Sequence, residues 1–421
     1  MINELPFDWI IDTLANRAII KSGTTPSRSE PAYWEKGTIP WVKTGEIDYR
    51  VIHHTEEHIT ETALRETSLQ QFPANTLLLA MYGQGVTRGK VAILGIDATV
   101  NQACAAITPR SPEAFDTEYV FYYLTYSYER LRAVSHGTQQ QNLNARIIAD
   151  FQIVLPPLPE QYRIALVLNT IQDSIAAQED VITAARQFKR SLIQRLFTYG
   201  PEKQPAETHE TEIGEVPIYW EVESIESIAT VKSGTTPNRK IVEYWKDGTI
   251  PWVKTGEVDY CVIGSTEEYV TPLAFRDTSL QLYPVGTVLL AMYGQGITRG
   301  KVAILGIEAT TNQACAALVP KNQTVSNLYL YHYLAFAYDR LRSKSHGTQQ
   351  LNLNSQIIES FFIPIPPLPE QHKIVDLLSC VDNKIAAEED RKTALQALFK
   401  STLHQLMTGQ IRLLSDEGLP L

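Results

Sequence analysis

The chain has 421 residues, 44% of them hydrophobic, and a formal net charge of −10. This length allows more than one hydrophobic core. The acidic balance excludes a protein that coats nucleic acid unaided, because nonspecific affinity comes largely from Lys and Arg that neutralise phosphates; it leaves room for local basic faces and for a more basic partner.

The composition also indicates a compartment. No apolar run approaches the roughly 18 residues of a membrane span, and the first residues lack the basic and apolar regions of a signal segment. The four cysteines form neither a disulfide framework nor a Cys-x-x-Cys metal pair. We therefore expect a cytoplasmic protein.

Nearly the same sequence occurs twice along the chain. Gly23-Thr-Thr-Pro, Tyr33-Trp34 and the stretch 37–46 return 211 positions later at Gly234, Tyr244-Trp245 and 248–257. The stretches Ser135 to Gln140 and Pro156 to Gln161 return 210 positions later. The repeat predicts two domains of one kind.

Within each copy the elements can be taken in order. Short apolar runs at 39–42, 76–80, 90–94 and 103–107, separated by Gly, Pro, Asn and Thr, predict strands. Residues 118–132 and 328–342 have the period of a helix, and we expect their tyrosines to pack in the core. A short helix at 144–151 and a strand at 152–155 complete the copy.

A long heptad pattern follows each Pro-Pro-Leu-Pro-Glu-Gln motif and predicts a long helix. Neither helix can bury its apolar seam alone, so we expect the two to pair antiparallel, with Gln178 and Glu388 at matched seam positions. The predicted seam positions are Ile164, Leu168, Ile171, Ile175, Gln178, Ile182, Ala185, Lys189, Leu192 and Leu196 in the first copy, and Ile374, Leu378, Val381, Ile385, Glu388, Lys392, Leu395, Phe399, Thr402 and Leu406 in the second.

These elements predict an α+β fold in which two similar strand-rich domains are joined by two long antiparallel coiled-coil helices with pseudo-two-fold symmetry. The expected boundaries are 1–155 for the first domain, 156–200 for its helix, 201–215 for an exposed linker, 216–365 for the second domain, and 366–421 for the second helix and a C-terminal tail.

The catalytic and metal motifs fail when the copies are compared. Gly89-Lys90 resembles a phosphate loop, but the required Gly and Ser or Thr are replaced by Gln84 and Val91. His53, His54 and His58 have no histidine at their counterparts, which argues against a metal site. No methyltransferase, hydrolase or nuclease signature holds in both copies. The sequence therefore predicts no enzyme, and no metal or cofactor in this chain.

The repeated loops carry the side chains that recognise DNA bases and phosphates, although solvated loops have a similar composition. Gln can bridge adenine, Arg and Lys contact guanine or phosphate, and Thr contacts the thymine methyl group. The predicted DNA-binding residues are Lys43, Thr44, Tyr82, Gln84, Thr87, Arg88, Lys90, Gln102, His136, Thr138, Gln139 and Gln140, with Lys254, Thr255, Tyr293, Gln295, Thr298, Arg299, Lys301, Gln313, His346, Thr348, Gln349 and Gln350 in the second copy.

Each copy contains Gly-Thr-Thr-Pro, Tyr-Trp and Ile-Pro-Trp-Val, and ends in Gly-Thr-Gln-Gln and Pro-Pro-Leu-Pro-Glu-Gln before a long helix. This arrangement resembles the specificity subunit of type I restriction-modification systems. The resemblance implies a non-catalytic subunit whose two target recognition domains each recognise one part of a split DNA sequence. It also implies that two modification subunits methylate adenine with S-adenosylmethionine, and that restriction subunits use ATP and Mg²⁺. It makes Gly23 to Pro26 part of the scaffold.

Two other functions remain open from the sequence. A twin-domain protein-binding scaffold, or an anti-restriction decoy without its own DNA target, would share this fold. If DNA is the ligand, the likeness of the loops predicts like half-sites, and a two-fold axis predicts an interrupted palindrome.

Overall fold

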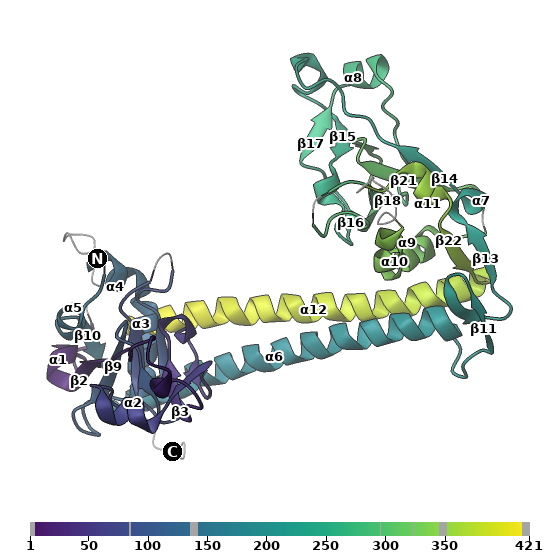
Figure 1. The fold of residues 1–421 in the computed structure, drawn as a ribbon. Coiled ribbons are helices and arrows are strands. Elements are labelled where there is room, and N and C mark those ends of the chain that lie inside the picture. The colour runs from purple at the N-terminus through teal and green to yellow at the C-terminus, as the bar shows by residue number, and fades with distance from the viewer. Residues whose placement is uncertain are drawn as a thin grey trace. The chain divides into compact units, whose positions relative to one another are not determined.

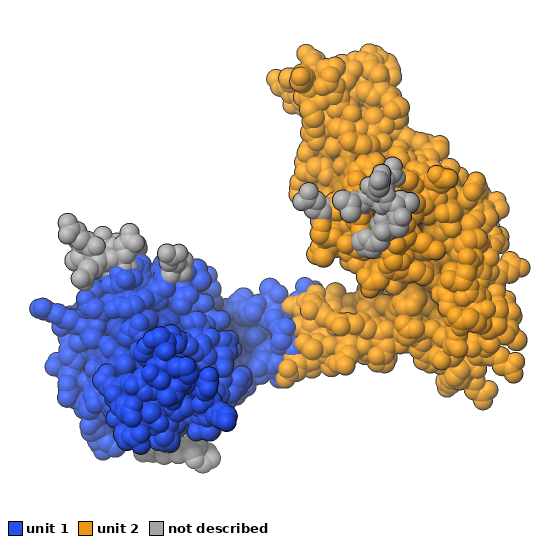
Figure 2. All heavy atoms as spheres, in the orientation of Figure 1, with its two compact units in different colours: residues 1–179, 390–421 blue, residues 180–389 orange. Residues whose placement is uncertain are grey.

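The structure is a computed structural model that describes residues 5–83, 86–134, 142–294, 296–322, 324–344 and 352–414. The chain divides into two compact units (Figure 2). The first unit comprises residues 1–179 and 390–421, and the second comprises residues 180–389. The division falls within both long helices, whereas the sequence predicted domains that end before them.

The first unit contains, in chain order, β1 (Ile10–Thr13), α1 (Leu14–Arg17), β2 (Ala18–Ser22), η1 (Pro31–Tyr33), β3 (Ile39–Val42), η2 (Thr44–Glu46), β4 (Val51–Ile52), β5 (Glu57–Ile59), α2 (Glu61–Glu66), β6 (Leu77–Ala80), β7 (Val91–Leu94), β8 (Thr99–Val100), β9 (Cys104–Pro109), α3 (Thr117–Tyr126), α4 (Tyr128–Val134), α5 (Ala145–Ala149) and β10 (Gln152–Leu155). The long helix α6 (Leu158–Tyr199) follows.

The second unit contains β11 (Thr208–Thr211), β12 (Gly214–Pro217), β13 (Glu221–Ser224), α7 (Ile225–Ile228), β14 (Ala229–Ser233), η3 (Val242–Tyr244), β15 (Ile250–Val253), η4 (Thr255–Glu257), β16 (Val262–Ile263), β17 (Glu268–Val270), α8 (Pro272–Asp277), β18 (Val288–Ala291), β19 (Val302–Leu305), β20 (Thr310–Thr311), β21 (Cys315–Pro320), α9 (Asn327–Phe336), α10 (Tyr338–Ser343), α11 (Ser355–Glu359) and β22 (Phe362–Ile365). The long helix α12 (Leu368–Met407) follows β22 (Figure 1).

The core of the first unit is built around a five-stranded sheet of order β2-β9-β6-β7-β4 and a three-stranded sheet of order β5-β3-β8. The central strand β6 is buried on both faces. Leu77 and Leu79 belong to the cluster that includes the α3 side chains, and Leu78 and Ala80 to the cluster that includes Val42 and other residues of the three-stranded sheet. Burial on two faces explains why β6 reads as an unbroken apolar run instead of an alternating one.

The far face of the three-stranded sheet carries a separate small core. Ile39, Trp41 and Ile59 pack there with Ala63 of α2 and with Leu69. The layers are therefore α3, the five-stranded sheet, the three-stranded sheet and α2. The second unit repeats the same strand orders with β14-β21-β18-β19-β16 and β17-β15-β20.

The helix pair confirms the predicted seam, because every predicted seam position of α6 and α12 is buried or half-buried. The pairing is antiparallel. Within the second unit, Arg186 is paired with Glu389 and Lys189 with Asp382, so partner numbers fall as α6 advances. Gln178 and Glu388 are 6% and 7% exposed, which places both polar seam residues inside their helix interfaces.

Each long helix ends inside the core of a domain from the other copy. Phe197, near the end of α6, is buried in the second unit against Tyr329, Tyr333 and Phe336. Met407, at the end of α12, is buried in the main core of the first unit. The predicted spacer helices are therefore also core elements.

Two segments differ from the sequence prediction. The single helix expected at 118–132 is broken at Ser127, and its counterpart is broken at Ala337, where ψ is near 10° in both cases. Because different residues break at the same place, packing imposes the break. The expected linker at 201–215 contains the β11–β12 hairpin, whose Ile213 carbonyl accepts a hydrogen bond from Arg340 (3.0 Å).

The segment after α12 binds to other parts of the first unit through Arg412. Arg412 donates to both oxygens of the Asp8 carboxylate and both oxygens of Glu160, at 2.8 to 3.0 Å. Glu160 is 1% exposed and also accepts from the indole of Trp9. These two carboxylates raise the pKa of Arg412, and Arg412 lowers that of Asp8.

No helix in the described ranges combines the length and the apolar character that crossing a bilayer requires.

Candidate nucleic-acid interface

Three predicted recognition segments meet at one edge of each domain, where β6 ends and β9 begins. In the first unit Met81 N donates to Ala103 O (2.8 Å), and Leu143 N donates to Met81 O (3.1 Å). Asn101 N donates to Val42 O (3.0 Å), next to Lys43. The described residues of the stretches 43–44, 82–90 and 101–102 are thus brought together by backbone contacts, with Leu143 beside them.

The described ends of the loop 82–90, residues 82–83 and 86–90, contact each other closely. Gly83 has φ +143°, and a Cβ there would lie 2.8 Å from Thr87 Cβ, so the position requires glycine. Gly89, at φ +89°, donates its N–H to Ala80 O (2.9 Å). The described residues therefore form a glycine-dependent turn that leads into β7.

Two residues of α4 hold this loop from the side. The Tyr128 hydroxyl donates to Val86 O (2.5 Å), and Arg132 Nη1 donates to Arg88 O (3.1 Å) and to the Tyr128 oxygen (3.0 Å). Tyr338 and Arg342 repeat the arrangement, with 2.6 Å to Ile297 O and 2.7 Å to Arg299 O. The sequence analysis missed these residues, although their recurrence 210 positions apart was a usable signal.

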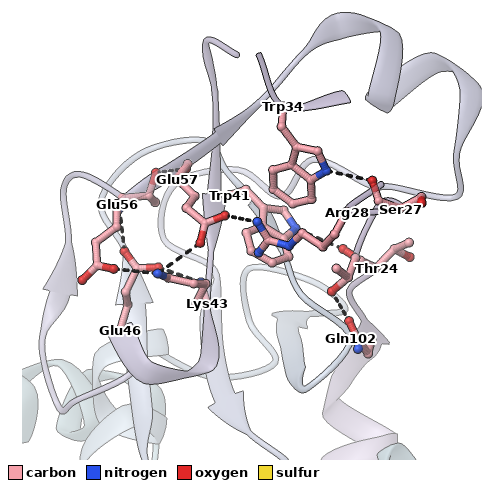
Figure 3. A network of polar contacts seen from close by, with 12 residues as sticks. Thr24, Ser27, Arg28, Trp34, Trp41, Lys43, Glu46, Glu56, Glu57 and Gln102 are labelled. Carbon is pink, nitrogen blue, oxygen red and sulfur yellow. Dashed lines mark hydrogen bonds and ion pairs between the residues drawn. The ribbon is translucent and has the colours of Figure 1, made fainter. Parts of the chain in front are cut away.

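Lys43 lies in a network of charges beside the three-stranded sheet (Figure 3). Its Nζ is 2.6 Å from Glu56 Oε2 and 3.2 Å from Glu57 Oε1, and the two carboxylates, Glu56 first, raise the pKa of Lys43. The buried Glu46 carboxylate accepts from the backbone N–H of Lys43 (2.7 Å) and of Glu56 (3.0 Å). Much of the Lys43 charge is therefore balanced within the protein.

Arg28 belongs to the same network and was missed by the sequence analysis as a potential site residue. Its guanidinium lies over the ring of Trp34, 3.8 Å from the centroid, and is ion-paired with Glu57. This pairing, followed by that with Lys43, lowers the pKa of Glu57. Arg239, Trp245 and Glu268 repeat the arrangement in the second unit.

Several other described candidates make short contacts, whereas Tyr82 is exposed. Lys90 pairs with Asp48 (2.6 Å) and Lys301 with Asp259 (2.6 Å). The exposed Gln102 accepts a hydrogen bond from Thr25, and the Thr44 hydroxyl donates to Asn101 Oδ1 (3.0 Å). Tyr82 is 40% exposed.

Arg88 differs from the expectation that this loop presents its polar side chains outward. It is 7% exposed, and Arg299 is 6% exposed. The backbone beside Arg88 is held close to α4, because the Arg88 carbonyl accepts from Arg132 and the Val86 carbonyl accepts from Tyr128. The described candidates on or beside the edge are Lys43, Thr44, Tyr82, Thr87, Arg88, Lys90 and Gln102, with Lys254, Thr255, Tyr293, Thr298, Arg299, Lys301 and Gln313.

The other predicted DNA-binding residues lie outside the described ranges. They are Gln84, His136, Thr138, Gln139, Gln140, Gln295, His346, Thr348, Gln349 and Gln350.

The Gly-Thr-Thr-Pro turn makes scaffold contacts. A Cβ on Gly23 would lie 2.0 Å from Val100 O, so the turn packs directly on β8. The Trp41 indole donates to Thr24 O (3.0 Å). Among the residues that the structure describes, no group of three or more His, Cys, Asp or Glu side chains is placed to hold a metal ion.

The sequence matches the family description of the type I restriction modification DNA specificity domain twice, over residues 8–184 and 217–397. The chain therefore belongs to this family of DNA specificity proteins and carries two copies of its domain.

Individual relatives agree with this assignment. The chain is 27% identical, over 98% of its length and 95% of the relative, to the type I restriction enzyme MjaIX specificity subunit of Methanocaldococcus jannaschii. Its fold is similar to that of the type I restriction-modification S subunit of M. genitalium, with a TM-score of 0.58, 15% identity and 96% of each chain covered. It is also similar to a chain from a structural study of complex assembly and conformational transition in the type I restriction-modification system, with a TM-score of 0.63, 15% identity, and 97% and 100% of the two chains covered.

Proposed function

We propose that this specificity subunit recognises an interrupted palindromic DNA sequence, with one half-site bound by each unit. The observation that carries the proposal is that the two candidate interfaces agree in side-chain contacts as well as in sequence. Lys43 and Lys254 make the same pair of ion contacts within 0.1 Å, and the Thr25–Gln102 contact recurs as Thr236–Gln313. Like side chains on like backbones recognise like bases.

The orientation of the half-sites is part of the same proposal. Equivalent helices that pair antiparallel have the relation that a two-fold axis produces. Proteins built on such an axis recognise inverted repeats. We therefore expect the same short half-site on each strand, separated by bases that are not recognised, with one adenine methylated in each half.

Catalysis belongs, in this proposal, to other subunits. Two modification subunits supply S-adenosylmethionine-dependent methylation, and restriction subunits supply ATP- and Mg²⁺-dependent translocation and cleavage, in the cytoplasm. The charge of −10 supports the need for partners, because the chain alone has few uncompensated cations for phosphates. Several of those at the interface, such as Lys43 and Lys90, are already paired with carboxylates.

Mapping of methylated adenines at base resolution tests the target. In a host that carries this chain and its modification subunit, we expect one interrupted inverted repeat. Two unrelated half-sites would contradict the palindrome. Absence of methylation that depends on this chain would favour a protein-binding scaffold or a decoy.

A binding assay tests the need for a partner. The purified chain should bind target DNA weakly at physiological salt and tightly once the modification subunit is added. Tight, sequence-specific binding by the chain alone would contradict the proposal that the modification subunit supplies part of the DNA affinity.

A further inference from the structure

Arg88 and Arg299 are buried cations with no ion-pair partner among the residues that the structure describes. Each side chain is more than nine-tenths buried, and in both residues the enclosed Nε makes no hydrogen bond. Across the described ranges, no carboxylate forms an ion pair with either guanidinium. Burying a charged donor without a partner is costly, so the arrangement calls for an explanation.

The neighbouring cations show that the fold does supply partners at this edge. Lys90 lies two residues from Arg88 and is paired with Asp48 at 2.6 Å, and Lys301 is paired with Asp259 at the same distance. Arg28 has both a carboxylate and an aromatic face. Like Arg88, Arg299 has no ion-pair partner in the described ranges. Because the sequences of the two copies differ elsewhere, a chance packing defect is a poor explanation.

The position of the guanidinium is set by the loop that carries it. Arg132 and Tyr128 bind the carbonyls of Arg88 and Val86, and Gly83 closes over the Arg88 backbone with its Cβ position 3.4 Å from Arg88 N. The second unit repeats these contacts with Arg342 and Tyr338. The arginine is therefore held before any ligand arrives, which reduces the ordering cost of binding.

We propose that Arg88 and Arg299 each bind one phosphate of the DNA backbone at the edge of the recognition interface. This inference rests on the proposed DNA recognition. A phosphate would supply the missing negative charge and the acceptor oxygens. It is favoured over a base because phosphates protrude from the rim of the duplex, whereas base edges lie in a groove about 8.5 Å deep that a recessed side chain cannot enter.

The proposal gives the two arginines a role in affinity and not in sequence choice. Each phosphate contact contributes about 0.9 to the slope of log binding constant against log salt concentration. Replacing both arginines should lower that slope by about 2, weaken binding uniformly across sequences, and leave the methylated sequence unchanged.

The test uses the full chain in complex with its modification subunit. Target and non-target duplexes are titrated by fluorescence anisotropy over a salt series with wild type, Arg88→Met/Arg299→Met and Arg88→Lys/Arg299→Lys. The lysine variant keeps the charge and should retain most of the slope. The matched control is Arg65→Met/Arg276→Met, which removes the same charge from exposed positions on α2 and α8 and should leave the slope unchanged.

The melting temperatures of the variants distinguish an arginine that binds a ligand from one that stabilises the fold. Removing an uncompensated buried charge should leave the melting temperature unchanged or raise it, so the methionine variant should bind DNA more weakly while folding at least as well. A clear fall in melting temperature would overturn the proposal in favour of a structural role. An equal loss of slope in the control would overturn it in favour of a general charge effect.

The remaining outcomes distinguish this inference from the function on which it rests. A changed base at one position of each half-site would overturn the phosphate assignment and indicate a guanine contact. Normal binding and salt dependence in the methionine variant would overturn this inference alone. If the wild-type complex binds no DNA, both the inference and the proposed function fail.

Discussion

Phe197 offers a direct test of whether the end of α6 is a structural part of the second unit. Its ring is 2% exposed and lies 5.1 Å from the rings of Tyr333 and Phe336 and 5.8 Å from that of Tyr329. Truncating a buried Phe to Ala costs about 3–5 kcal/mol. For a unit of this size, about 1 kcal/mol corresponds to about 2–4 °C, so Phe197→Ala should lower its melting temperature by about 6–20 °C.

The matched control lies on the same helix. Phe188 is 58% exposed, and Phe188→Ala should change stability by no more than about 0.5 kcal/mol. Differential scanning calorimetry of the wild-type chain and both variants makes the comparison. If the two variants lose the same stability, or if Phe197→Ala loses none, α6 does not contribute to this core in the way the contacts indicate.

Three further outcomes are expected. Arg412→Met leaves the buried Glu160 carboxylate without its cation and should lower the free energy of unfolding in urea by about 3 kcal/mol. Adding Glu160→Gln should recover part of this loss. An unchanged free energy of unfolding in Arg412→Met would contradict a stabilising role for Arg412. Because the pKa of Glu57 is lowered from 4.5, its stabilising effect is present above pH 4.5 and is lost as pH falls through the lowered value, so Glu57→Gln should be less stable than wild type above pH 4.5, with the gap closing in acid. A thiol reagent should label the exposed Cys261 and Cys380 of the native chain and no other cysteine, as mass spectrometry can check, because burial raises the pKa of the other two thiols to about 12.

The interface shows how the same charge can have different roles at neighbouring positions. Lys43, Lys90 and Arg28 are cations that the protein itself partly neutralises, whereas no carboxylate in the described ranges is paired with Arg88, whose Nε makes no hydrogen bond. If DNA displaces the internal carboxylates from Lys43 and Lys90, part of the binding energy is offset by the loss of those ion pairs. This arrangement favours selectivity over simple attraction to phosphate.

The sequence by itself determined the features that follow from local pattern. The repeat predicted two like domains, the apolar runs predicted β3, β6, β7 and β9, and the heptads predicted both long helices and the burial of Gln178 and Glu388. The tyrosines of residues 118–132 were expected in the core; Tyr119, Tyr122 and Tyr123 are buried there, whereas Tyr126 is 38% exposed. These features could be predicted because side-chain periodicity fixes which face of an element can be buried.

Only the tertiary structure decided the features that depend on residues far apart in the chain. Periodicity could not show that Phe197 and Met407 enter cores of the opposite copy, or that Asp48 neutralises Lys90, because such contacts depend on how the chain returns to itself. Residues 201–215 were expected as a linker because their composition is polar, yet most of the β11–β12 hairpin lies there, and its paired backbone accepts from Arg340. The sequence pattern of Arg88 is that of an ordinary loop cation, yet the residue is buried, and the backbone on which it stands is held by the distant Tyr128 and Arg132 through carbonyl contacts.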